Sequence, residues 1–254
     1  MGTWQTFDAG PSKFDALREV VQTMKNSGAR LLDSSPMYGR AEQVTGILSQ
    51  ELGAENFFYA TKVWTEGRTA GIQEMEDSMK KMQRSSLDLI QVHNLVDWKT
   101  HLDTLKEWKA SGRTRYIGIT HYTNSMHEAL EKIISTVAVD FVQFNYSISS
   151  RNAEKRLLPA SAHHGVATLI NRPLDEGKLF QKTRGKKLPE WCHEIGVNNW
   201  TEFFLKFILS HPAVTCVIPA TADRTHATEN FQSGLAPLPD ELTRNRMAHW
   251  FDAL

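Results

Sequence analysis

The chain has few cysteines, no excess charge of either sign and no long apolar run, and each shortage excludes a class of protein. Its two cysteines, Cys192 and Cys216, lack Cys-x-x-Cys spacing, which excludes a disulfide framework and a cysteine-based redox or zinc motif. Lys plus Arg and Asp plus Glu each number 29, so the formal net charge is zero and a basic nucleic-acid-binding surface is not expected. No run approaches the roughly 18 apolar residues of a membrane span.

Length and composition predict one globular domain in a reducing setting. The 254 residues are 41% hydrophobic and 23% charged, which suits a single domain over residues 1–254. Residues 1–10 have no basic flank followed by an apolar stretch, so no signal peptide is predicted and we expect a cytoplasmic location. A targeting segment lost upstream would leave no trace here. We expect no membrane or nucleic-acid partner, and a monomer or weak homo-oligomer.

Short strand-like runs alternate with stretches of helical period along the whole chain. Apolar residues three and four apart, as in Leu17, Val20, Val21 and Met24, predict helices between the runs. The eight strand-like runs are residues 1–4, 29–33, 57–62, 87–92, 116–120, 141–145, 168–171 and 215–218. This alternation predicts an α/β protein with a parallel sheet closed into a (β/α)8 TIM barrel. A doubly wound open sheet is disfavoured because no Gly-x-Gly-x-x-Gly follows a strand.

Local signals punctuate this pattern. Gly28, Gly53, Gly112 and Gly165 fall where helices should end. The segment 125–128, Ser-Met-His-Glu, is typical of a capping box at a helix start. Residues 175–199 form an irregular insert, whose basic cluster at 182–187 we interpret as a solvated loop, and residues 237–254 predict a brief final helix.

Four polar side chains fall at or just after predicted strand ends, where barrels of this kind place their active sites. Asp33, Lys62 and His93 end three successive strands, and Tyr38 follows Asp33 by five residues. Neighbouring strands lie roughly 4.8 Å apart, so these side chains should share one pocket. They suit hydride transfer to a carbonyl, in which Tyr38 donates the proton. We expect Lys62, held by Asp33, to lower the pKa of Tyr38, and His93 to hydrogen-bond the substrate oxygen.

Several phrases in the sequence resemble, in order, those of the aldo-keto reductase superfamily. They are Gly-Thr-Trp at 2–4, Leu-Asp-Ser-Ser-Pro-Met-Tyr-Gly at 32–39, Thr-Lys-Val-Trp at 61–64, Leu-Asp-Leu-Ile-Gln-Val-His at 87–93, Tyr-Ile-Gly-Ile-Thr at 116–120, Gln-Phe-Asn-Tyr at 143–146 and Ile-Pro at 218–219 followed by Asn230. The resemblance implies a short bacterial member with a nicotinamide cofactor across the barrel mouth and Asp33, Tyr38, Lys62 and His93 as catalytic residues. Relatives usually begin with a hairpin under the barrel, which would be missing or truncated here.

The same resemblance implies the residues that contact the cofactor. They are Thr3, Trp4, Asp33, Thr120, His121, Gln143, Asn171, Arg172, Pro173, Leu174, Ile218, Pro219, Ala220, Thr221, Arg224, His226 and Asn230. Asn171 replaces the tyrosine that usually stacks on the nicotinamide, and Arg172 could reach the pyrophosphate instead.

The loop after the last strand departs most from the family pattern. Ala220 and His226 stand where cations usually hold the 2′-phosphate, and Asp223 adds a negative charge. Arg224 could replace part of what is missing. We therefore expect NADP(H) to be favoured, with NAD(H) possible.

The substrate itself stays open. Trp4, Trp64, Asn94, Trp98 and Tyr122 are expected to line its pocket, which suits a small carbonyl compound such as a sugar-derived aldehyde, a small ketone or a quinone. No metal site is predicted, because the histidine pairs lack convergent carboxylates or cysteines. One alternative function remains, a cofactor-sensing binding module with little turnover, as in the potassium-channel beta subunits; a complete set of four residues does not separate the two.

Overall fold

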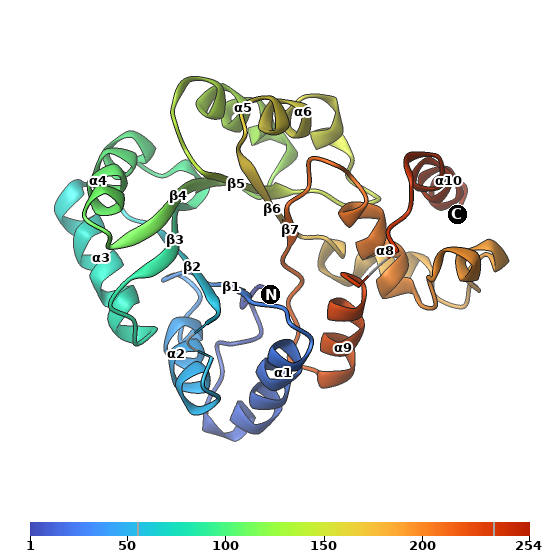
Figure 1. Cartoon of the computed structure of the whole chain (residues 1–254), viewed down its shortest axis with the longest axis horizontal. Helices are drawn as coiled ribbons and strands as arrows, with labels where there is room; N and C mark the ends of the chain where they lie inside the picture. Colours follow the sequence, from blue (N-terminus) through green and yellow to red (C-terminus); the bar gives the residue numbers. More distant parts are fainter. Residues whose placement is uncertain (55, 236) are drawn as a thin grey trace.

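A computed structural model describes residues 1–54, 56–235 and 237–254. Seven strands form one sheet in sequence order, each pair parallel. They are β1 (Leu31–Asp33), β2 (Phe58–Val63), β3 (Leu87–Val92), β4 (Thr114–Thr120), β5 (Phe141–Asn145), β6 (Ala167–Asn171) and β7 (Cys216–Val217). The sheet curls into a ring with helices outside it (Figure 1). The predicted α/β-barrel class is confirmed.

The predicted first strand is reduced to a single parallel bridge, between Gly2 and Asp33. The chain turns at Trp4, and Gln5 has a φ of 62°, which ends the extended conformation after Thr3. Residues 1–3 still form backbone hydrogen bonds with the chain on both sides of them. The Gly2 N–H donates to Pro219 O at 3.1 Å, and the Asp33 N–H donates to Met1 O at 2.9 Å. Residues 1–3 therefore lie between β1 and the end of β7 and occupy the eighth position of the ring.

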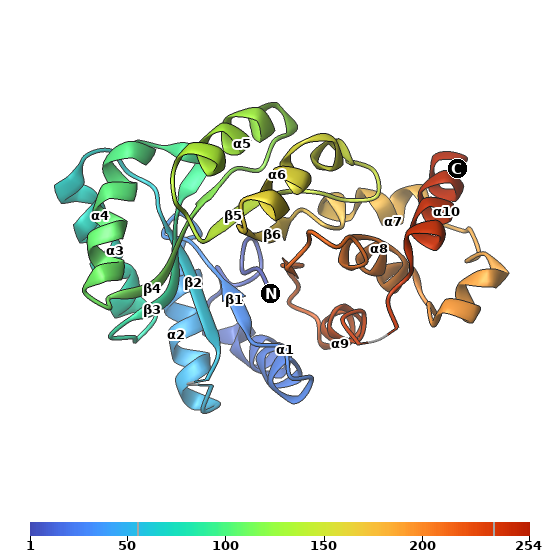
Figure 2. The same ribbon diagram turned by 45° about the horizontal axis from the view of Figure 1, so that its top comes forward.

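Ten α-helices lie in the described part of the chain. They are α1 (Phe14–Asn26), α2 (Ala41–Glu51), α3 (Arg68–Lys81), α4 (Trp98–Ala110), α5 (His127–Thr136), α6 (Leu157–His163), α7 (Lys178–Lys182), α8 (Trp200–Leu209), α9 (Arg224–Gln232) and α10 (Glu241–Asp252). Short 3-10 turns are η1 (Pro11–Lys13), η2 (His93–Leu95), η3 (Asn124–Met126), η4 (Asn152–Lys155), η5 (Asp175–Gly177) and η6 (Glu190–Ile195). Figure 2 shows α1 to α6 around the strands, with α7, α8 and α10 grouped beyond β6. Helix α1 buries Leu17, Val20, Val21 and Met24, the stripe that its sequence predicted.

The local signals are confirmed in part. Gly28, Gly53, Gly112 and Gly165 have φ between 57° and 76° just beyond helix ends, as predicted. The predicted capping box is wrong: α5 starts at His127 without a side-chain cap, because the Ser125 hydroxyl is paired with that of Thr123 at 3.0 Å. The insert 175–199 is not only loop. It contains η5, α7 and η6, since Leu179 and Cys192 are buried there.

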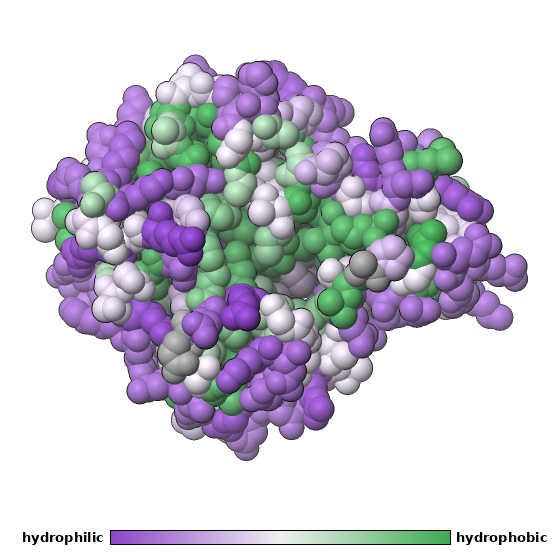
Figure 3. All heavy atoms as spheres, in the orientation of Figure 1, coloured by the Kyte–Doolittle hydropathy of each residue, from purple (hydrophilic) through white to green (hydrophobic). Residues whose placement is uncertain are grey.

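Apolar residues form two cores, and the smaller one fills the ring of strands. Buried Ala60, Leu89 and Leu169 pack there against half-buried residues from the strand starts. Those half-buried residues are Leu31, Phe58, Tyr116, Phe141 and Cys216. Figure 3 shows apolar side chains gathered over the middle of the ring. Because this apolar cluster lies towards the starts of the strands, polar side chains are expected at the carboxyl ends of the strands. No helix in the described ranges is long and apolar enough to cross a membrane.

Candidate active site

The four predicted catalytic side chains meet at the carboxyl end of the sheet. Lys62 Nζ on β2 donates to Asp33 Oδ2 on β1 at 2.6 Å and to Ser34 O at 2.7 Å. It also lies 5.2 Å from the centre of the Tyr38 ring. The His93 ring, directly after β3, packs edge-on against that of Tyr38 with 5.8 Å between centres. The four side chains thus converge at this end of the sheet, and their catalytic role stays a prediction.

The electrostatics of Lys62 and Tyr38 differ in one respect from expectation. Burial lowers the pKa of Lys62, but the negative charge of Asp33 and the contact with Tyr38 outweigh it, so the pKa rises above 10.5 and Lys62 stays cationic. Burial raises the pKa of Tyr38 above 10.0, and the Lys62 charge offsets only part of this rise. The predicted lowering of the Tyr38 pKa is therefore wrong for this structure. The phenol therefore remains protonated at neutral pH.

His93 is neutral and contacts Ser35 through its Nδ1 atom. Burial, followed by the nearby Lys62 charge, lowers the pKa of His93 to about 2. Ser35 Oγ lies 3.1 Å from His93 Nδ1 and accepts from the Met37 N–H at 3.4 Å. When the Ser35 hydroxyl donates to Nδ1, the single ring proton of His93 is on Nε2 and is available as a donor.

A buried amide network extends from Asp33 across the barrel. Gln91 Nε2 and Gln143 Nε2 both donate to Asp33 Oδ1, at 3.1 and 3.0 Å. Thr120 Oγ1 donates to Gln143 Oε1 at 3.4 Å. Gln143 and Thr120, both predicted to bind cofactor, thus belong to the hydrogen-bond network of Asp33 in this structure. Gln91 was missed, although it precedes His93 by two residues and so faces the barrel interior with Leu89.

Two further predicted cofactor residues stand at the end of β6. Asn171 Nδ2 donates to His121 O at 3.2 Å, while Asn171 Oδ1 is buried with no hydrogen-bond partner among the described residues. The Arg172 guanidinium lies 4.5 Å from the centre of the Tyr122 ring and pairs with Glu176 at 2.9 Å. Arg172 is therefore held between the Tyr122 ring and Glu176. Pro173 is buried and Leu174 half-buried behind them.

The loop after β7 carries the remaining predicted cofactor residues. Ile218, Pro219, Thr221 and Asn230 are buried, whereas Ala220, Arg224 and His226 are exposed. Asp223 Oδ1 caps α9 by accepting from the His226 N–H at 3.0 Å, and this bond is the main cause that lowers the pKa of Asp223. Asn230 Oδ1 is buried without a partner in the described chain. Asp223 thus keeps a negative charge at the start of α9.

The rim of the site is aromatic. Trp4, Trp64 and Tyr122 expose 38%, 42% and 42% of their surface. Asn94 and Trp98 follow His93 in sequence and are half-buried, and Asn94 has a strained φ of 51°. Thr3 is fully buried, and its hydroxyl lies 2.9 Å from Ser34 Oγ and 3.1 Å from Asp33 O, next to the catalytic candidates.

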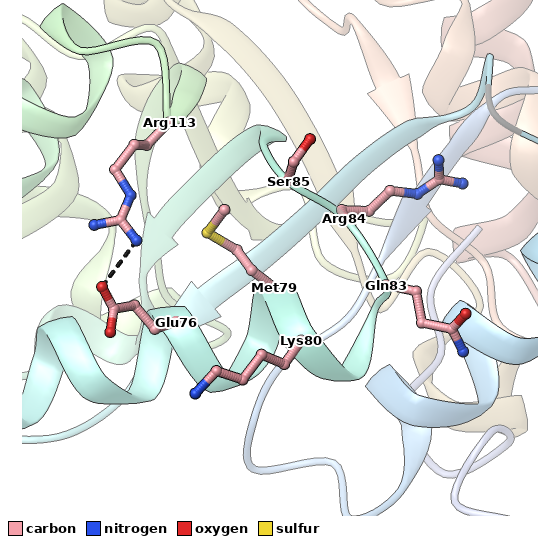
Figure 4. A pocket seen from close by; sticks show the side chains of 7 residues that line it. All are labelled: Glu76, Met79, Lys80, Gln83, Arg84, Ser85 and Arg113. Carbon is pink, nitrogen blue, oxygen red and sulfur yellow. Dashed lines mark hydrogen bonds and ion pairs between the residues drawn. The ribbon is translucent and has the colours of Figure 1, made fainter.

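Two surface hollows lie outside the four-residue cluster. One, of about 400 Å³, borders the rim at the ends of β4, β5 and β6 and includes Tyr122, Asn145 and Arg172. The other, of about 510 Å³, is lined by the residues in Figure 4 and contains the Arg113–Glu76 ion pair of 2.9 Å. Its residues Gln83, Arg84, Ser85 and Arg113 precede β3 and β4, so it lies at the far end of the barrel from Lys62.

Comparison with known proteins agrees with this geometry. Residues 1–245 match the Aldo/keto reductase family. The chain belongs to that family, which confirms the resemblance seen in the sequence.

Individual relatives are more distant. Aldo-keto reductase YhdN of Bacillus subtilis is 26% identical over 213 residues, 76% of this chain and 62% of that protein. An NADH-specific methylglyoxal reductase of Escherichia coli is 24% identical, over 70% of this chain and 64% of its own length. The chain thus spans less than two thirds of either relative. An aldo/keto reductase from Klebsiella pneumoniae in complex with NADP and acetate has the same fold, with a TM-score of 0.84 over 99% of this chain and 90% of that one at 19% identity.

Proposed function

We propose that this protein is an NAD(P)H-dependent oxidoreductase that reduces a small aldehyde or ketone to an alcohol, with Tyr38 as proton donor. The observation that carries the proposal is the convergence of Tyr38, the buried Lys62–Asp33 pair and neutral His93 at one end of the barrel. An aldo/keto reductase family match over residues 1–245 supports the same reaction class.

The residues at the barrel mouth fit a nicotinamide cofactor. Asn171 and Asn230, both expected to contact it, keep buried amide oxygens that no described residue satisfies. Such oxygens accept from the amide or hydroxyl groups of a dinucleotide. Thr221, Arg224 and His226 would face the adenosine end, and Asn171 with Arg172 the nicotinamide and pyrophosphate. When bound, the cofactor supplies the hydride.

Side chains of the protein then bind and protonate the carbonyl oxygen of the substrate. The Nε2–H of His93 donates to the carbonyl oxygen and fixes its approach. The Tyr38 phenol gives its proton to that oxygen as negative charge develops there. Lys62 stabilises the phenolate that remains, and Asp33 with its two glutamine donors keeps Lys62 charged and in place.

Relatives bear on the cofactor and substrate class. A structural neighbour binds NADP, and a sequence relative is an NADH-specific methylglyoxal reductase. Because Asp223 is charged and Ala220 stands in place of a cation, we infer that the preference for NADPH is only modest. We also infer a small carbonyl substrate that fits between Trp4, Trp64 and Tyr122.

The test is the Tyr38→Phe variant, with Tyr116→Phe at the barrel floor as the matched control. We expect Tyr38→Phe to reduce carbonyl turnover by roughly 10²- to 10⁴-fold, while tryptophan fluorescence shows nearly unchanged binding of NADPH. Tyr116→Phe should keep wild-type turnover. If Tyr38→Phe retains more than half of the wild-type rate, Tyr38 is not the donor. If the wild-type protein binds cofactor but reduces none of a broad carbonyl panel, a cofactor-sensing role replaces the enzymatic one.

A further inference from the structure

We propose that Glu42 is a positioning residue, whose hydrogen bond with Thr61 fixes the distance between Tyr38 and Lys62. The inference rests on the proposed function and concerns the same site. Thr61 Oγ1 donates to Glu42 Oε1 at 2.5 Å, and both side chains are almost completely buried. Neither residue touches the reacting groups, so its effect must pass through the segments that carry them.

Each partner of this bond is tied to one catalytic residue. Glu42 lies in the first turn of α2, and the Ala41 N–H of that turn donates to the carbonyl of Tyr38 at 3.1 Å. Any shift of α2 therefore moves Tyr38. Thr61 immediately precedes Lys62 on β2, and successive strand residues face opposite sides. Thr61 thus faces α2 while Lys62 faces the barrel interior, and the Glu42–Thr61 bond links the two supports.

A carboxyl group at this place has no evident packing role. The Glu42 side chain is only 1% exposed, and its nearest cation, Lys81 Nζ, is 3.9 Å from Oε2. In the described residues Oε2 has no hydrogen-bond partner beyond the neighbouring buried Ser78 hydroxyl of α3. Burial raises the pKa of Glu42, against the smaller opposing effects of the Thr61 bond, of Ser78 and of the Lys81 and Lys62 charges. An apolar side chain would fill this volume without that cost.

Glu42 contributes a directional contact, which fixes how α2 is rotated against β2. The rest of the buried face of α2, including Val44 and Leu48, packs through apolar contacts, which are non-directional. Gly46 lets the helix approach the backbone of Lys81 and Met82 closely but does not fix its rotation. A single buried hydrogen bond to the strand does fix it. A shift of the order of 1 Å between reacting groups costs about 10²-fold in rate.

The experiment uses Glu42→Leu, Thr61→Val and the double variant, with Ser49→Ala as matched control. Ser49 is a buried hydroxyl on the same helix without a hydrogen-bond partner in the described chain, two turns away from Glu42. We expect Glu42→Leu to lower kcat by roughly ten- to a hundredfold without a matching change in the Kd for NADPH. The pH at which kcat begins to change should be higher in Glu42→Leu than in the wild type. The reason is that the Lys62 charge, which counteracts the raised Tyr38 pKa, moves away from Tyr38.

The double variant separates positioning from stability. Replacing both partners by apolar groups removes the unsatisfied donor and acceptor, so urea unfolding should return to near wild type. We expect kcat to stay low nevertheless, and Glu42→Gln, whose amide oxygen still accepts from Thr61, to keep most of the wild-type kcat. Recovery of kcat in the double variant would show that Glu42 acts only on stability. A loss of kcat in Ser49→Ala as large as that in Glu42→Leu would show the same.

The Tyr38→Phe variant separates this inference from the proposed function. If Tyr38→Phe is active, the proposed function fails. If Tyr38→Phe is inactive while Glu42→Leu has wild-type kcat, only this inference fails.

Discussion

Replacing Lys62 with methionine removes the charge on which we expect both the stability and the proposed chemistry of the site to depend. Lys62 and Asp33 are a buried ion pair, with side chains 0% and 3% exposed and 2.6 Å apart. Removing one member of such a pair leaves an uncompensated buried charge, which costs about 3 to 5 kcal/mol. Asp33 keeps hydrogen bonds from Gln91 and Gln143, so we expect a loss near ~3 kcal/mol, the lower end of that range.

The matched variant adds Asp33→Asn to Lys62→Met. The asparagine oxygen still accepts from both glutamines, and no charge is left buried, so most of the stability should return. Urea unfolding followed by circular dichroism measures both variants. Carbonyl reduction should be lost in each, since Tyr38 has no cation to stabilise its phenolate. An unfolding midpoint for Lys62→Met equal to that of the wild type would contradict the reasoning, as would a double variant no more stable than the single one.

Three further predictions follow from other residues of the site and its support. His93, with a pKa lowered from 6.5 to about 2, takes up its proton only on unfolding between those values, so stability should fall with decreasing pH below 6.5 by up to about 1.4 kcal/mol per pH unit. In urea titrations, the free energy of unfolding should differ less between pH 5 and pH 7 in His93→Gln than in the wild type. An equal pH dependence in the two proteins would disprove this prediction. The NADPH preference over NADH should stay below about a hundredfold, since each charged hydrogen bond to the 2′-phosphate contributes ~1.5 to 3 kcal/mol and two cations are missing. A thousandfold preference in the Kd values of the two cofactors would mean that the loop is misread. Gly46→Ala places a Cβ 2.4 Å from Lys81 O and should destabilise the protein by about 1 to 3 kcal/mol, whereas an unchanged urea midpoint would show that α2 and α3 can separate freely.

The sequence predicted those features that follow from period and strand order. Asp33, Lys62 and His93 could be placed together because parallel strands end at one edge, and α1 because its apolar residues repeat at helical spacing. The family phrases located Tyr38 between two of these strands. These features depend on local pattern and on topology, both of which are visible in the chain.

Other features depend on contacts between distant segments and could not be predicted. The direction of the Tyr38 pKa is set by how much water the folded site excludes, which outweighs the Lys62 charge. Glu42 has the sequence signature of a solvated first-turn acid, yet β2 buries it. The start of α5 shifted because Thr123, outside the expected motif, paired with Ser125.

Under the proposed function, the raised pKa of Tyr38 predicts a different pH dependence for the two directions of the reaction. Reduction would require the protonated phenol, and burial raises the pKa of Tyr38, so that the phenol stays protonated at neutral pH. Oxidation of an alcohol requires the phenolate as base, which is scarce at neutral pH for the same reason. The alkoxide formed during reduction is a much stronger base than a phenolate, so a raised pKa does not hinder proton donation. We therefore expect kcat for reduction to be flat between pH 6 and 9, while kcat for oxidation rises with pH throughout that range. Initial rates in both directions on one carbonyl–alcohol pair measure this. A reduction rate that falls by half near pH 7, in a protein still folded there, would mean that the Tyr38 pKa is lowered and that Lys62 outweighs burial after all.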